Sequence, residues 1–105
     1  MELNLFWTEF AENELEGIYK YYREKAGIVI SKKLIKGIYN ETLNLKNQPE
    51  IGQIEGVLEN RKEEFRYLIY KNYKIIYWIN SKESRIEVSD VFDTRQYPSK
   101  IKRNK

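Results

Sequence analysis

Hydrophobic and polar residues alternate at the start of the chain and then change to a helical spacing. Leu3, Leu5 and Trp7 occupy every second position, which predicts a strand over residues 2–7 with one apolar face. Thr8 follows with a side chain that can cap a helix. A single apolar stripe then advances by four, three and four residues, through Ala11, Leu15, Ile18 and Tyr22. The pattern predicts a strand that leads directly into a helix.

A second helix is predicted from residues 28–31 to a point before Pro49. Its inner stripe is mainly aliphatic and consists of Leu34, Ile35, Ile38, Thr42 and Leu45. Only a short turn around Gly27 separates the two helices, so they should form an antiparallel hairpin. Gly37 costs the second helix about 1 kcal/mol relative to Ala, and its small size would permit a close approach to the first helix.

Three β-rich segments follow a polar connection over residues 47–63, which is either a binding loop or a route back to the sheet. The segments are residues 65–70, 73–79 and 86–92. Lys71 and Asn72 fit a two-residue hairpin turn, because Asn tolerates a positive φ angle. The order predicts a single α+β domain over residues 1–105. It has an N-terminal strand, an antiparallel helical hairpin and a three-stranded antiparallel meander, with the helices on one face of an antiparallel sheet.

The composition excludes many enzyme classes. The 105 residues include no Cys, which rules out a disulfide, a thiol nucleophile and a zinc–thiolate site. They include no His, which rules out a Ser-His-Asp triad and the commonest general base. No segment approaches the roughly 20 apolar residues of a membrane span, and the N-terminus lacks a secretory signal. We therefore expect a cytoplasmic protein with no membrane partner, whose chemistry comes from Lys, Arg, Tyr, Glu or Asp or from partners.

Charge is distributed unevenly around a net value of +3. Residues 1–17 contain five Glu and no basic residue, whereas residues 94–105 contain five basic residues and no acidic one. This basic tail could contact phosphates or an acidic protein partner, or it could simply keep the chain soluble.

Three segments in this order resemble the RelE/ParE superfamily of bacterial toxins. The sequence WTEFAENELEGIYKYY, residues 7–22, is similar to the first strand-to-helix passage of the superfamily. The sequence FRYLIYKNYKIIYWI, residues 65–79, is similar to its central hairpin. The sequence VFDTRQYPSK, residues 91–100, is similar to the ending of many plasmid-stabilisation members. The resemblance implies the toxin of a type II toxin–antitoxin pair, neutralised by a small antitoxin protein encoded beside it.

The superfamily contains two activities, and the resemblance leaves both open. RelE-like members cleave mRNA on the ribosome without a metal, whereas ParE-like members poison DNA gyrase. A degenerate module that only binds an antitoxin is a third hypothesis. None of the three implies a metal or another cofactor. The gyrase hypothesis requires an exposed surface, which the helical hairpin and the basic tail could supply.

The mRNA-cleavage hypothesis assigns a catalytic role to five residues. Arg66, Lys74 and Arg95 would hold the phosphate. Tyr97 would stack on a base or transfer a proton, and Lys100 would assist. Lys74 stands where RelE-like enzymes usually have Arg, which replaces a bidentate group with a point charge. An unperturbed Tyr or Lys titrates near pH 10, so a general base would need a strongly lowered pKa.

Each candidate also has a structural interpretation. Arg66 could pair with Glu64, Glu87 or Asp93, and Arg95 could pair with Asp93 where the chain leaves the sheet. Lys74 could be an exposed cross-strand partner, and Tyr97 a packing residue. Four tyrosines are typical strand residues rather than an RNA-stacking platform: Tyr67, Tyr70, Tyr73 and Tyr77. The mRNA-cleavage hypothesis gains if Arg66, Lys74, Arg95 and Tyr97 converge on one concave face and loses if they point apart.

Overall fold

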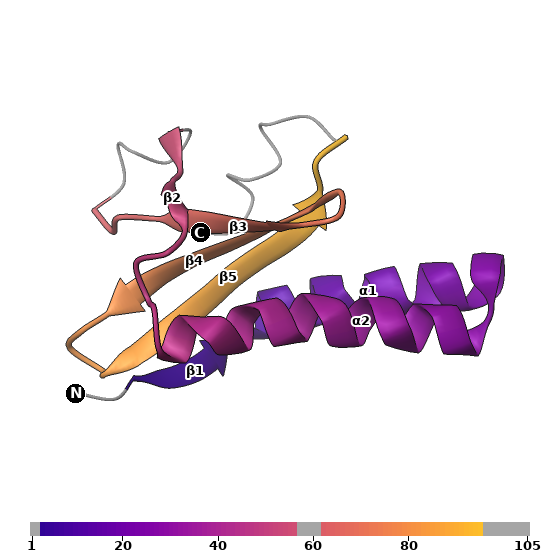
Figure 1. Cartoon of the computed structure of the whole chain (residues 1–105), viewed down its shortest axis with the longest axis horizontal. Coiled ribbons are helices and arrows are strands. Elements are labelled where there is room, and N and C mark those ends of the chain that lie inside the picture. The colour runs from indigo at the N-terminus through magenta and orange to yellow at the C-terminus, as the bar shows by residue number, and fades with distance from the viewer. Residues whose placement is uncertain (1–2, 57–61, 96–105) are drawn as a thin grey trace.

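Two long helices cover one face of a five-stranded sheet, and their far ends extend beyond it (Figure 1). The structure is a computed structural model and describes residues 3–56 and 62–95. Its elements are β1 (Asn4–Trp7), α1 (Glu9–Ala26), α2 (Ile28–Leu43), the 3-10 helix η1 (Asn44–Lys46), β2 (Gln53–Ile54), β3 (Arg66–Tyr70), β4 (Tyr73–Asn80) and β5 (Arg85–Asp93). The predicted α+β order of strand, helical hairpin and three-stranded meander is confirmed.

The sheet has the strand order β1-β5-β4-β3-β2. The neighbours from β2 to β5 are antiparallel, as predicted for the meander. The expectation of a purely antiparallel sheet is wrong, because β1 pairs parallel with β5 and places Trp7 opposite Val88. Alternation of apolar residues defines the two faces of a strand but not the direction of its neighbour. The N-terminal strand therefore closes the sheet against the last strand in the sequence.

The polar connection contributes an edge strand that its composition does not indicate. Gln53 and Ile54 form β2 and pair with β3. In the turn between β3 and β4, the positive φ angle of 55° belongs to Lys71, not to Asn72 as predicted. The two-residue turn itself is present between Tyr70 and Tyr73.

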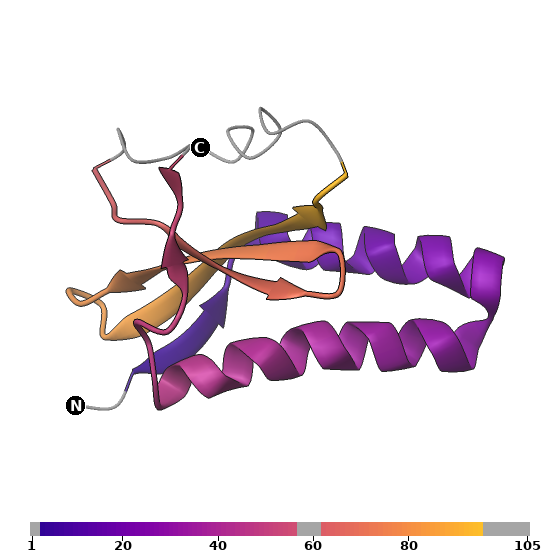
Figure 2. The same cartoon turned by 45° about the horizontal axis from the view of Figure 1, so that its top comes forward.

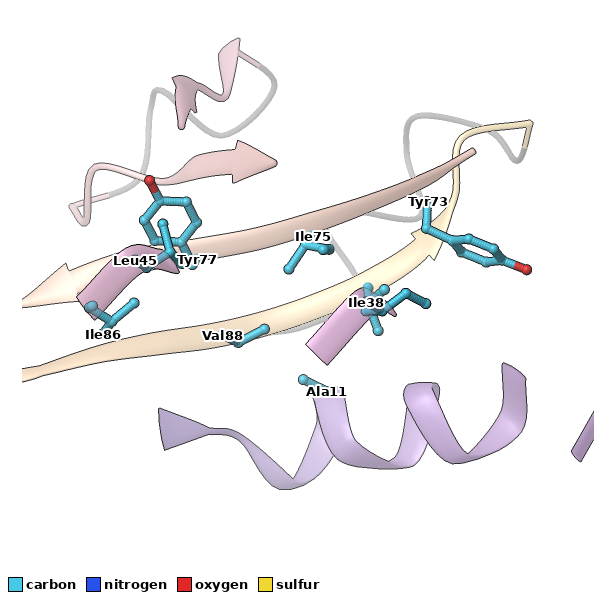
Figure 3. Close-up of a cluster of buried hydrophobic side chains, with 9 residues drawn as sticks. Ala11, Ile38, Leu45, Tyr73, Ile75, Tyr77, Ile86 and Val88 are labelled. Carbon is cyan, nitrogen blue, oxygen red and sulfur yellow. The ribbon is translucent and has the colours of Figure 1, made fainter. Parts of the chain in front are cut away.

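The core lies between the helices and the sheet. Figure 3 shows Ala11 of α1 and Ile38 of α2 facing the strands, which contribute Ile75 and Val88. All four side chains are fully buried. The predicted stripes of both helices thus form the interface with the sheet, and Thr8 caps α1 by accepting a 3.1 Å hydrogen bond from the backbone N–H of Ala11.

Gly37 makes its close approach to the sheet rather than to the first helix as predicted. A Cβ atom at this position would lie 2.1 Å from Oη and 2.3 Å from Cζ of Tyr70 on β3. The absence of a side chain at Gly37 therefore allows α2 to pack on the tyrosine ring.

Candidate functional site

Arg66 fixes the connection between α2 and β2. Its guanidinium donates hydrogen bonds to the carbonyl oxygens of Glu50 (3.2 Å) and Gly52 (2.9 Å) and to Oε1 of Glu64 (3.2 Å). Tyr77 binds the same loop, because its hydroxyl donates to the carbonyl of Pro49 (2.8 Å) and accepts from the backbone N–H of Gly52 (2.9 Å). The Arg66 side chain is 17 % exposed. Of the three carboxylates named as possible partners of Arg66, Glu64 is the one it contacts, and the guanidinium is engaged in holding the loop.

Lys74 lies on β4 and pairs with a carboxylate that the sequence did not indicate. Its Nζ atom is 2.5 Å from Oε1 of Glu55, whose side chain is 4 % exposed. The same ammonium lies 4.2 Å from the ring centroid of Tyr67, which adds a cation–π contact. The Tyr67 hydroxyl in turn donates a 2.8 Å hydrogen bond to Oε1 of Gln53. Lys74 thus joins β4 to the β2–β3 edge of the sheet.

Arg95 follows the end of β5 and pairs with Asp93, as its structural interpretation predicted. Its Nε donates to both carboxylate oxygens of Asp93, at 2.9 and 3.0 Å, and Nη2 contacts the same carboxylate. The hydrogen bonds from Arg95 hold the pKa of Asp93 well below its usual range. Arg95 and Asp93 line a cleft of about 410 Å³ between α1 and the end of the sheet, together with Tyr22 and Tyr73.

The three candidate catalytic cations that the structure describes, Arg66, Lys74 and Arg95, do not converge on one site. The register places Arg66 opposite Tyr77, while Lys74 lies opposite Ile69. Because side chains alternate along a strand, Arg66 shares the helix-facing side of the sheet with Tyr77, and Lys74 lies on the other side. Arg95 is near Tyr73, the first residue of β4, whereas Arg66 lies opposite Tyr77, four residues further along that strand. Tyr97 and Lys100 lie outside the described residues, so their positions relative to these groups stay untested.

Two of the strand tyrosines are unsuited to accept a proton at neutral pH. Tyr73 is 4 % exposed and Tyr77 is fully buried. Burial raises the pKa of the Tyr73 hydroxyl, and a hydrogen bond with Tyr22 raises it further. Burial also raises the pKa of Tyr77, although the hydrogen bond from Gly52 opposes this effect. Both phenols are therefore protonated, and the prediction that they are structural agrees with their burial in the core.

Comparison of the sequence with protein families identifies the chain. Residues 5–98 match the family described as the ParE toxin of the type II toxin–antitoxin system parDE. The chain belongs to the ParE toxin family. The match covers both helices and all five strands except Asn4, the first residue of β1. A search of curated proteins found no sequence match.

Solved structures show that this ParE toxin shares its fold with both branches of the superfamily. The chromosomal ParDE system of P. aeruginosa contains a chain with a TM-score of 0.72 and 17 % identity, covering 88 % of this chain and 96 % of that one. A free double mutant of the E. coli toxin RelE matches with a TM-score of 0.59 and 16 % identity, covering 99 % of this chain and 94 % of that one. A chain of the toxin–antitoxin complex RelBE2 of Mycobacterium tuberculosis matches with a TM-score of 0.55 and 14 % identity, covering 89 % of this chain and 99 % of that one.

Two features of the ParE toxin were missed by sequence reasoning. Glu55, the partner of Lys74, lies 19 residues earlier in the polar connection, where no periodic pattern marks it. The Tyr22–Tyr73 contact joins α1 to β4, and only the predicted helical stripe through Tyr22 pointed toward the sheet. Among the described residues, no helix is long and apolar enough to span a membrane.

Proposed function

We propose that this ParE-family toxin arrests growth by acting on DNA gyrase and does not cleave mRNA. The observation that carries the proposal is the arrangement of Arg66, Lys74 and Arg95. Each of them pairs with a carboxylate, and the register separates Arg66 and Lys74 onto opposite sides of the sheet. Metal-free RNA cleavage needs cations that meet at one phosphate and a group that accepts the 2′-hydroxyl proton. Arg66, Lys74 and Arg95 are each engaged with a carboxylate of their own instead.

We also propose that a cognate antitoxin neutralises the toxin. Two of the similar structures are described as a ParDE system and as a RelBE2 toxin–antitoxin complex, which supports a protein partner of this kind. The excess of basic residues over residues 94–105 favours an antitoxin segment that is acidic. Such a segment would bind as an amphipathic helix or as an added strand.

The two toxic mechanisms are separated by a short induced pulse of the chain, followed by two measurements on the same culture. Gyrase poisoning predicts DNA breaks that require gyrase, together with intact 5′ ends of translated messages. New in-frame cleavages within messages, without DNA breaks, would contradict the proposal and favour a RelE-like nuclease. Normal growth with neither signal would favour the degenerate antitoxin-binding module.

Arg95→Ala provides a mutational test, because Arg95 is 72 % exposed and its loss should leave the chain folded. If the helical hairpin rather than the basic tail makes the gyrase contact, growth arrest should match wild type at equal toxin levels. The control is Arg85→Ala, which removes a partly exposed arginine at the start of β5. If Arg95→Ala alone relieved growth arrest while antitoxin binding persisted, the assignment of Arg95 to phosphate binding would regain support.

A further inference from the structure

The helical hairpin is electrically polarised along its length. Its base, residues 9–17 and 37–43, contains five acidic residues and no basic one. Its tip, residues 18–36, contains six basic residues and one acidic residue. Base and tip are therefore of opposite sign, although the net charge of the whole chain is only +3.

The dipoles of the two helices do not account for this polarity. In α1, acidic residues near the N-terminus and basic residues near the C-terminus match the helix dipole. In α2 the order is reversed: no acidic residue stands in its first turn, Lys32 and Lys33 lie in its first half, and Glu41 is near its C-terminal end. The charges of α2 gain nothing from its own dipole, so they require another explanation.

Contacts within the described part of the chain leave most of the tip cations without a carboxylate partner. In residues 3–56 and 62–95, the only tip cation with an ion pair is Lys20, which lies 3.6 Å from Glu16. Arg23 and Lys25 lie over the rings of Tyr19 and Tyr21 instead. The tip thus presents positive charge to the outside.

An open apolar groove of about 470 Å³ lies between β1 and the two helices, and it extends from the base to Tyr19 and Ile35 of the tip. Its apolar side chains include Trp7, Leu15, Ile35 and Tyr39, and Tyr39 is 42 % exposed although it stacks on Trp7. Glu12 and Glu16 also line the groove and are exposed. The groove therefore fits a segment that is both apolar and basic.

The hairpin tip carries apolar and basic side chains together on the same face. On α1, the groove residue Tyr19 is followed four positions later by Arg23, whose guanidinium lies 5.6 Å from the Tyr19 ring centroid. On α2, Ile35 is preceded at helical spacing by Lys32 and Ile28, and Ile28 is 50 % exposed. Figures 1 and 2 show that this end of the hairpin extends past the sheet, which leaves it accessible.

We propose that two copies of the chain associate antiparallel through this hairpin face, with the basic tip of each copy in the acidic groove of the other. A two-fold axis near the middle of the hairpin makes both contacts at once. The face is two helices wide and about 27 Å long, which gives roughly 500 Å² per copy. This is less than the ~800 Å² per partner of a standard interface, so the dimer should be weak and sensitive to salt.

The proposal is tested with the purified full chain, freed of antitoxin, by sedimentation equilibrium over a range of concentrations. Two charge-reversal variants are compared: a base variant, Glu12→Lys with Glu16→Lys, and a tip variant, Arg23→Glu with Lys32→Glu. Each variant alone brings like charges together at both contacts and should raise the dimer dissociation constant about tenfold or more. An equimolar mixture of the two pairs opposite charges at both contacts, so dimers should reappear.

The mixture also controls for folding, because two misfolded variants could not restore each other. A second control, Lys62→Glu with Lys82→Glu, changes the net charge as much as the tip variant does but at exposed positions outside the hairpin. It should leave the dissociation constant unchanged. A chain that stays monomeric at all concentrations, a dimer insensitive to the two hairpin variants, or a mixture that stays monomeric would each overturn the proposal.

Discussion

At the scale of single residues, the Lys74–Glu55 pair combines a partly exposed cation with a carboxylate that is almost fully buried. Removing the cation leaves the Glu55 charge without this partner in a site from which water is largely excluded. We expect Lys74→Met to lower the free energy of unfolding by about 2 kcal/mol, measured by urea denaturation. Adding Glu55→Gln should recover most of the loss. An equal loss in Lys82→Met, at an exposed turn position, would show that the pair is not its cause.

Asp93 gives the fold an acid-sensitive contribution. The hydrogen bonds from Arg95 lower the pKa of Asp93 from its ordinary value of 3.8. The unfolded chain therefore binds a proton at Asp93 before the folded chain does, and the stabilisation is complete above about pH 4 and declines as the pH falls below it. Asp93→Asn should flatten the dependence of the unfolding free energy on pH below about pH 4. A variant as steep as wild type would assign the acid sensitivity to other carboxylates.

The predictability of the candidate site depends on how far apart its partners are in sequence. The Arg66–Glu64 and Arg95–Asp93 pairs join residues two positions apart, so their contacts could be predicted from the sequence. The partner of Lys74 comes from an irregular segment whose position is set by the fold, so it could not be predicted. Arg66 lies opposite Tyr77, and Tyr77 is three residues from Lys74 on the same strand. Because side chains alternate between the two faces of a strand, the separation of Arg66 and Lys74 across the sheet follows once the register is known.

At the scale of elements, the two mid-helix glycines should respond oppositely to the same substitution. A Cβ atom added at Gly17 of α1 would meet no atom within 4 Å, whereas one at Gly37 of α2 would meet the ring of Tyr70. We expect Gly17→Ala to raise the free energy of unfolding by about 1 kcal/mol through helix propensity. Gly37→Ala should lower it by about 1–2 kcal/mol, because Tyr70 must move. In a Tyr70→Ala background, Gly37→Ala should become stabilising; a persistent loss would contradict the assigned contact.

The helices and the meander could be predicted because each of their sequence patterns is long. Residues 11–22 follow one apolar helical stripe, and residues 73–79 form a continuous run of β-branched and aromatic residues around Lys74, with a turn on each side. The partner of β1 could not be predicted, because pairing with β5 joins Asn4 to Arg85 across most of the chain. The two residues of β2 are too few to show a period, and they are held in place by pairing with β3.

At the scale of the whole molecule, one core joins the layers. Buried side chains of α1, α2, β4 and β5 belong to a single cluster, so the helices cannot leave without exposing the inner face of the sheet. The opposite face has a smaller cluster around Ile76 and Phe92, covered partly by Phe65 and Tyr67. Unfolding should therefore be a single cooperative transition in which both faces are lost together.

The two tryptophans report on opposite sides of the molecule and can test this cooperativity. Trp7 lies on β1 and stacks on Tyr39 of α2, whereas Trp78 lies on β4 beside Phe65. In the single-tryptophan variants Trp78→Phe and Trp7→Phe, fluorescence and far-ultraviolet circular dichroism should give the same denaturation midpoint within each variant. The protein concentration must be held constant, because hairpin association would stabilise the folded state. If fluorescence of Trp7 were lost at a lower denaturant concentration than the dichroism signal, β1 and the hairpin would form a separate unit that detaches before the meander unfolds.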